Sequence, residues 1–170
     1  WNNNHAQYIR SNQGGGHWDF NKKFNKNWIL NYELINGKII KFNVEPTSFK
    51  HTGIFPEQAV NWDWMTRLIE DRKTKIDGPV KVLNLFAYTG GASVACLKAG
   101  AHVTHVDSSR GMIDWCKENV KSSKVDETKV RFLVDDCVKL VKREIRRGNK
   151  YDAIIMDPPS YGRGANGEVW

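Results

Sequence analysis

The sequence is poor in cysteine and has no long apolar run. Its 170 residues include three cysteines, Cys96, Cys116 and Cys137, which are widely spaced and form no C-x-x-C pair. This pattern indicates neither a disulfide framework nor a zinc site, so we expect free thiols. Nothing approaches the ~18 consecutive apolar residues of a membrane span, and the first ten residues lack the charged-then-apolar order of a secretory signal. We therefore expect a cytoplasmic protein without a membrane partner.

The composition is typical of a globular domain. With 40% hydrophobic and 26% charged residues, the chain is neither a disordered tail nor a fibrous repeat. Its 26 lysines and arginines exceed its 19 acidic residues by seven, which favours an anionic partner without naming one. The five histidines lack metal-ligand spacing, so we expect no metal site. Because the chain begins on Trp1 and ends on Trp170, we expect an excerpt of a longer protein.

The first 55 residues predict a small antiparallel β element. Apolar residues alternate with polar ones over 28–34 and again over 39–44, on either side of Asn36-Gly37. Period-two runs around an Asn-Gly pair are a hairpin signal. The pattern then changes at Pro56, which suits a first helical turn. Apolar residues at helical spacing, Val60, Trp64, Leu68 and Ile69, predict a helix of about twenty residues ending near Gly78.

Strands and helices alternate regularly over the rest of the chain. We predict strands at 80–86, 101–106, 129–134 and 151–156, and helices at 92–99, 111–122 and 138–147. Parallel strands need right-handed helical crossovers, so this order predicts an α/β fold with a Rossmann-like doubly wound parallel sheet. We divide the chain into the β element, 1–55, and this domain, 56–170.

Four strand ends carry the candidate chemistry, because ligands of such sheets sit beyond the carboxyl ends of the strands. The first strand runs into the small-residue turn 84–91, and the second ends at Asp107, 16 residues after Gly91. The third ends at Asp135-Asp136 and the fourth at Asp157. A glycine turn is often only a turn, and a lone aspartate is often a helix cap. Their combination around one crevice favours a nucleoside-type cofactor, with Asp107 placed to accept the ribose hydroxyls.

Two nucleoside cofactors compete for this turn. NAD needs G-x-G-x-x-G so that its pyrophosphate can approach the backbone, and the turn has no such run. S-adenosylmethionine has no phosphate, so a looser turn with Thr89, Gly90 and Gly91 suffices. The Asp157-Pro158-Pro159 corner supports this reading, because prolines expose carbonyl oxygens without competing N–H donors. A merely rigid turn is the alternative reading of that corner.

Three segments carry a family resemblance: NLFAYTGGASVACLKAGAHVTHVDSS, FLVDDCVKLV and YDAIIMDPPSYGRG. They resemble the motifs of class I S-adenosylmethionine-dependent methyltransferases. The match is strongest to the subfamily of the bacterial ribosomal RNA large-subunit methyltransferase I, which methylates cytosine at ring carbon five. FKHTGIFPEQAVNW resembles the segment before the Rossmann-like domain of that subfamily, so the resemblance covers about 45–170. It implies S-adenosylmethionine as the cofactor and RNA as the substrate, with ribosomal RNA as the leading candidate.

The resemblance also implies site residues. Those for cofactor binding are Phe55, Gln58, Phe86, Ala87, Thr89, Gly90, Gly91, Asp107, Ser108, Asp136 and Cys137, and those for catalysis are Asp157, Pro158, Pro159 and Tyr161. By resemblance, the glycine turn surrounds the methionine part, Asp107 holds the ribose, and Asp136 with Cys137 faces the adenine. Phe55 and Gln58 would close over the cofactor, and Asp157 would position the nucleophilic atom.

Two departures bear on the reaction. Amine methyltransferases place an aromatic residue directly after Pro-Pro to stack on a flipped base, whereas this chain has Ser160 there and Tyr161 next. Methylation at ring carbon five needs a thiolate to attack the neighbouring carbon. The three cysteines lie in or beside predicted helices and are expected to be structural, so that nucleophile would lie outside this chain. The family sheet has seven strands and the sequence predicts four, so we expect little activity from the chain alone.

A basic stripe is the remaining clue to the substrate. Its members recur at helical spacing on the helix predicted at 138–147 and just beyond it: Lys139, Lys142, Arg143, Arg146, Arg147 and Lys150. This face could meet RNA phosphates, or it could be a solvated outer face. The alternative functions are therefore an RNA-binding module with a vestigial cofactor fold and a methyltransferase of a protein or small molecule. Trp18, Trp28, Trp62 and Trp64 could stack on bases or build the core of the β element.

Overall fold

The computed structural model describes residues 3–12, 15–23, 25, 27–47 and 50–159. Its centre is a parallel four-stranded sheet of β5 (Lys81–Leu85), β6 (His102–Asp107), β7 (Val130–Val134) and β8 (Ala153–Met156). The strands lie in the order β7-β6-β5-β8. The predicted Rossmann-like α/β fold is thus confirmed. In the described part of the chain, no helix is long and apolar enough to cross a membrane.

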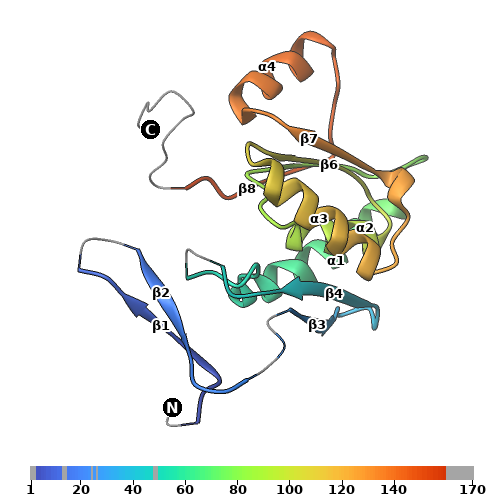
Figure 1. The fold of residues 1–170 in the computed structure, drawn as a ribbon. Coiled ribbons are helices and arrows are strands. Elements are labelled where there is room, and N and C mark those ends of the chain that lie inside the picture. Colours follow the sequence, from blue (N-terminus) through green and yellow to red (C-terminus); the bar gives the residue numbers. More distant parts are fainter. Residues whose placement is uncertain (1–2, 13–14, 24, 26, 48–49, 160–170) are drawn as a thin grey trace.

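Helices cover both faces of this sheet (Figure 1). They are α1 (Ala59–Lys73), α2 (Gly91–Ala99), α3 (Arg110–Ser122) and α4 (Cys137–Arg146), with short 3-10 turns η1 (Pro56–Gln58) and η2 (Glu127–Lys129). Successive strand residues point to opposite faces. Val82 accordingly packs into the core shared with α1, α2 and α3, whereas Leu83 packs with Leu140 of α4. Each crossover helix therefore has an apolar strand face to cover.

The predicted N-terminal β element is confirmed and consists of two hairpins. The first pairs β1 (Ala6–Arg10) with β2 (Gly16–Phe20), and the second pairs β3 (Trp28–Glu33) with β4 (Ile39–Val44), both antiparallel. Alternate β4 side chains, those of Ile40, Phe42 and Val44, are buried in the same core as α1 and α2. The second hairpin thus shares the core of the sheet, and a domain boundary at residue 55 stays a prediction.

The first helix differs from its prediction in length and in its buried face. Together η1 and α1 span 56–73, shorter than the expected helix, because the Thr74 and Lys75 N–H groups close tight turns onto Asp71 and Arg72. The buried face of α1 is formed by Trp62, Met65, Thr66 and Ile69. Three of the four residues that predicted the helix, Val60, Trp64 and Leu68, are instead 72%, 61% and 47% exposed. Helical spacing identified the helix correctly but not the side that meets the core.

Phe42→Ala is expected to lower the free energy of unfolding by about 3–5 kcal/mol, as for other fully buried phenylalanines. The Phe42 side chain is fully buried, and its ring centroid lies 5.0 Å from that of Trp62 in α1. Urea denaturation measures the change. Ile39→Ala in the same strand is the control, because Ile39 is 48% exposed and should cost only about 0.5 kcal/mol. Equal losses would show that the second hairpin does not contribute to the core.

Candidate active site

The turn after β5 has an unusual backbone. Phe86, Tyr88 and Gly90 all have positive φ angles, of 53°, 52° and 86°. Non-glycine residues in the left-handed region are strained and persist only when their surroundings hold them. One such support is the hydrogen bond from the Ala87 N–H to the Val106 carbonyl oxygen in β6, at 3.0 Å. The predicted glycine turn is therefore a strained loop at the carboxyl edge of the sheet.

The Asp107 carboxylate joins this turn to the loop after β6. Its Oδ2 accepts a hydrogen bond from the Tyr88 N–H, and its Oδ1 accepts one from the Ser109 N–H, both at 2.9 Å. Asp107 is not the cap of α3, because the Ser109 hydroxyl accepts the Met112 N–H. Each carboxylate oxygen can accept more than one hydrogen bond, so both keep capacity for hydroxyl donors of a ligand.

The far side of the turn is held by α3 and by the segment before η1. The Asn119 amide donates from Nδ2 to the Thr89 carbonyl oxygen at 2.8 Å, and the Thr89 hydroxyl donates to the Gly53 carbonyl oxygen at 2.6 Å. A Cβ on Gly90 would lie 2.1 Å from Cys116 Sγ, so only glycine fits against α3. Because the Thr89 hydroxyl already donates its proton to Gly53, it has none to donate to a ligand, although Thr89 lines the cavity next to this turn.

A cavity of about 520 Å³ is bordered by η1 and α1 and runs along β8 to Asp157, beside β5 and the turn that follows it. The predicted site residues that line it are Phe55, Gln58, Phe86, Ala87, Thr89, Gly91 and Asp157. Among the described residues of the lining, none is a lysine, arginine or histidine, and Asp157 is the one acidic residue. The cavity therefore suits a ligand that is partly apolar and carries positive charge at the acidic end.

Aromatic side chains form one wall of this cavity. The centroid of the Phe55 ring lies 5.2 Å from that of the Tyr88 ring and 5.3 Å from that of the His51 ring. Trp64 and Leu68 of α1, both exposed, also belong to the lining. Sequence reasoning found Phe55 but not Tyr88 or Trp64 as wall residues, although aromatic residues flanking a glycine turn were a visible signal.

The other predicted site residues lie outside this cavity. Asp136 caps α4, with its Oδ1 accepting the Lys139 N–H at 2.8 Å, and Asp135 pairs with Arg143. Cys137 is buried, and this burial raises the pKa of its thiol. The charges of Asp107 and Asp136 raise that pKa further, whereas a hydrogen bond from the Phe86 N–H lowers it. The Cys137 thiol is thus close enough to the turn after β5 and to the Asp107 and Asp136 carboxylates to interact with them. The remaining predicted residues are Asp107, Gly90 and Ser108, outside the lining, Pro158 and Pro159, which are exposed, and Tyr161, which with Ser160 lies outside the described residues.

A buried polar chain beneath the turn escaped sequence reasoning. Asn84 donates from Nδ2 to the Ser93 hydroxyl, and that hydroxyl lies 2.9 Å from His105 Nδ1. His105 is fully buried in β6, and burial lowers its pKa to about 4. The signal was present as polar residues inside otherwise apolar strands. Cys116 lies beside His105 at 3.6 Å between Sγ and Nδ1.

The three cysteines are free and buried, as expected. Burial raises the pKa of Cys96 to about 12 and also raises that of Cys116, where the Asp107 charge adds to the effect. A thiol needs to ionise before it can act as a nucleophile. Neither Cys96 nor Cys116 is therefore suited to attack a substrate.

The parallel sheet, the strained glycine turn beside Asp107 and the cavity that ends at Asp157 are features of an α/β protein that binds a nucleoside-type ligand. More specifically, the chain belongs to the S-adenosylmethionine-dependent methyltransferase family, whose model matches residues 25–167. Family membership assigns S-adenosylmethionine as the cofactor, in agreement with the prediction.

Similar proteins agree with this membership. The ribosomal RNA large subunit methyltransferase I of Tolumonas auensis is 37% identical over 123 residues, which are 72% of this chain and 29% of the relative. A solved S-adenosylmethionine-dependent methyltransferase from Agrobacterium tumefaciens is 41% identical with a TM-score of 0.84, covering 100% of this chain and 51% of that one. A methyltransferase structure complexed with SAH is 27% identical with a TM-score of 0.72, covering 91% and 37%. The chain thus spans about a third of the curated relative.

Gly90→Ala is expected to destabilise the protein more than Gly148→Ala. Both glycines have positive φ angles, so alanine strains either backbone by about 1–2 kcal/mol. Only at Gly90 would the new Cβ also collide with Cys116, because nothing lies within 4 Å of a Cβ at Gly148. Urea denaturation should show that Cys116→Ala reduces the extra cost of Gly90→Ala. An undiminished cost in that double variant would contradict this contact as its cause.

His105 is expected to make stability fall with acid. Its folded pKa of about 4 lies below the ordinary 6.5, so the unfolded chain binds the proton more readily. The contribution of neutral His105 to the free energy of unfolding is therefore fully present above pH 6.5 and is lost as the pH falls towards 4. Between pH 7 and pH 5, urea denaturation should show the wild type losing about 2 kcal/mol more than His105→Asn. An equal loss of unfolding free energy in the two proteins between pH 7 and pH 5 would refute this role of His105.

Proposed function

We propose that this chain carries the cofactor site of a methyltransferase that acts on a base of RNA, with ribosomal RNA as the substrate. The observation that carries the proposal is the cavity that joins the glycine turn to Asp157 at one edge of the sheet. Relatives named as ribosomal RNA large subunit methyltransferase I, 33–43% identical over the matched parts, support the choice of substrate.

The cavity fits the cofactor in size and in charge. Its volume of about 520 Å³ is in the range of small-molecule sites. When bound, S-adenosylmethionine supplies a methyl group on a positively charged sulfur, for in-line attack by an atom of the substrate. The lining has aromatic and apolar groups, and the described lining residues contribute no cationic side chain that would repel that charge. The Asp157 carboxylate places a negative charge at one end of the cavity, where it can attract the positively charged sulfur.

We assign the binding roles as follows. The turn from Phe86 to Gly91 holds the methionine part with its backbone, and the Asp107 carboxylate accepts the ribose hydroxyls with its remaining capacity. Asp136 and Cys137 lie towards the adenine, although the Asp136 carboxylate also caps α4. Phe55 and Gln58 border the cavity and exclude water from it.

Asp157 orients the substrate. Its carboxylate can accept a hydrogen bond from an N–H or O–H of the base and hold the reacting atom in line, and it can take a proton where one is released. Methylation at ring carbon five would need a thiolate as well, and the raised pKa values of the chain's cysteines do not suit that task. The proposal therefore assigns the thiol to none of them.

Calorimetric titration with S-adenosylmethionine tests the assigned roles. We expect Asp107→Ala to weaken binding about 10- to 100-fold, because charged acceptors for the ribose and for two backbone amides are lost together. Asp157→Ala should keep the affinity within about threefold but lower methyl transfer to RNA, since its carboxylate acts on the substrate. Asp77→Ala, an exposed aspartate outside the cavity lining, is the control and should match the wild type.

Three results would contradict the proposal. A folded chain that binds no S-adenosylmethionine lacks the proposed site. RNA binding without cofactor binding would favour the alternative of an RNA-binding module with a vestigial cofactor fold. Transfer of labelled methyl groups to a protein or small molecule, without competition from RNA, would favour the other class of substrate.

A further inference from the structure

A second cavity, of about 250 Å³, lies at the opposite end of the sheet. Its lining includes the first residues of three strands, Lys81 of β5, His102 of β6 and Val130 of β7. Because these strands are parallel, their amino ends share one edge, away from the carboxyl edge that holds the cofactor cavity. The lining is completed by Val103, Thr104, Thr128, Lys129, Arg131, Asn149, Lys150 and Tyr151.

This cavity is strongly basic. Lys81, Lys129, Arg131 and Lys150 line it, and the described residues of the lining include no aspartate or glutamate. The nearby acids are already engaged. Asp152 accepts from Arg72 and from the Lys81 backbone N–H, and Asp126 lies 3.8 Å from Lys129 Nζ while also capping η2. Glu144 of α4 is buried and pairs with Arg131 and Arg147.

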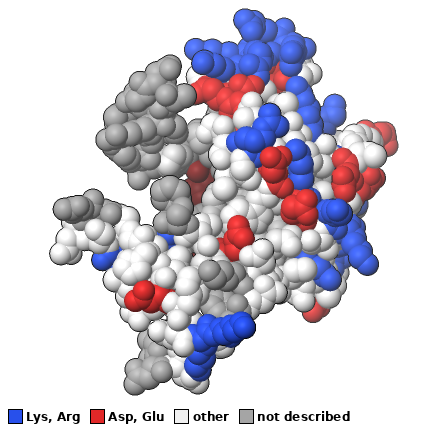
Figure 2. Space-filling view, viewed as in Figure 1, with Lys and Arg blue, Asp and Glu red and all other residues white. Residues whose placement is uncertain are grey.

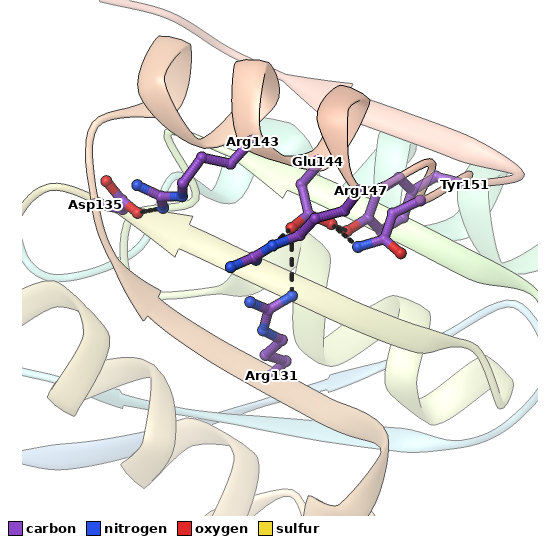
Figure 3. Close-up of polar contacts among 7 residues, drawn as sticks. Arg131, Asp135, Arg143, Glu144, Arg147 and Tyr151 are labelled. Carbon is purple, nitrogen blue, oxygen red and sulfur yellow. Dashed lines mark hydrogen bonds and ion pairs between the residues drawn. The ribbon is translucent and has the colours of Figure 1, made fainter.

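The buried Glu144 carboxylate orients Arg131 (Figure 3). Its Oε1 lies 3.5 Å from an Arg131 nitrogen and 3.4 Å from an Arg147 nitrogen, while its Oε2 accepts from the Tyr151 hydroxyl at 2.6 Å and from the Asn149 amide at 2.7 Å. Burial raises the pKa of Glu144, but these hydrogen bonds and the Arg131 charge outweigh it, so the net pKa lies below its ordinary value. Arginine has five N–H donors, so an Arg131 held through one nitrogen keeps others for an anion.

The cavity continues into the basic face of α4. Asn149, Lys150 and Tyr151 line it and begin three residues after the end of that helix. Arg147 and Arg131 both lie beside the Glu144 carboxylate. Figure 2 shows lysine and arginine side chains gathered over α4. Of the predicted stripe, Arg143 pairs with Asp135 and Arg147 with Glu144. Cations thus extend well beyond the space of one phosphate group, as a polyanion would require.

We propose that this cavity binds two adjacent backbone phosphates of RNA, and that α4 carries the phosphates next to them. The choice of RNA as the polyanion rests on the proposed function. The site lies at the amino edge of the sheet, so it anchors RNA away from the reacting base and adds affinity without reading sequence. It is distinct from the cofactor cavity in every residue of its lining.

Fluorescence anisotropy with a labelled single-stranded RNA tests this site. The double variant Lys81→Gln/Lys129→Gln removes two cations from the cavity but none from α4 or the cofactor cavity. We expect it to weaken binding roughly 25-fold in 0.1 M salt and to reduce the slope of log K against log salt by roughly 1.4, for two lost phosphate contacts. Lys75→Gln/Lys121→Gln removes the same charge from exposed side chains elsewhere and should stay within about threefold of the wild type.

The remaining outcomes separate this inference from the proposed function. Calorimetry with S-adenosylmethionine should give equal affinities for both double variants and the wild type, which shows that they are folded. If the wild type binds cofactor and RNA but the cavity variant behaves like the control, this inference alone is overturned. Wild-type protein that binds no RNA, or that binds phosphatidylglycerol vesicles through these lysines instead, also overturns it. Loss of cofactor binding by the folded wild type would instead contradict the proposed function.

Discussion

The Asp107 carboxylate accepts one backbone N–H from each of the two loops that border the cofactor edge of the sheet. Its bonds to Tyr88 and Ser109 tie the loop after β5 to the loop after β6. The loop after β5 contains two non-glycine residues, Phe86 and Tyr88, with positive φ angles, a conformation that needs outside support. The same carboxylate can therefore shape the cofactor edge and still offer acceptors to a ligand that lies on it.

Helix α3 supports that edge from behind and couples it to the N-terminal hairpin. Asn119 is fully buried; its Oδ1 accepts the Asn43 N–H of β4 at 2.8 Å, and its Nδ2 donates to the Thr89 carbonyl oxygen. One amide thus satisfies backbone groups of two segments that lie far apart in the sequence. Buried polar groups are costly when unpaired, so displacement of the hairpin would also disturb the turn. The hairpin therefore helps to hold the turn of the candidate site in place.

The two edges of the sheet differ in their electrostatics. Around the cofactor cavity the described lining residues carry one acidic and no cationic side chain, which suits a cationic ligand. At the amino edge, four cations line the second cavity, and the buried Glu144 holds Arg131 and Arg147 near it. Parallel strands allow this separation because all carboxyl ends lie on one side and all amino ends on the other. The fold can thereby separate cofactor binding from attachment of a polyanion.

The order of strands and helices, the glycine turn and the acidic strand ends could be predicted from the sequence, because these features follow from local periodicity and chain direction. The sequence also indicated that the turn and Asp157 meet, since parallel strands share a carboxyl edge. Three features depend instead on tertiary packing: the face of α1 that is buried, the link that Asn119 makes between the hairpin and the turn, and the hydrogen bond from Thr89 to Gly53. Those contacts join residues 30 or more positions apart, and no local spacing specifies which partner lies across a packed interface.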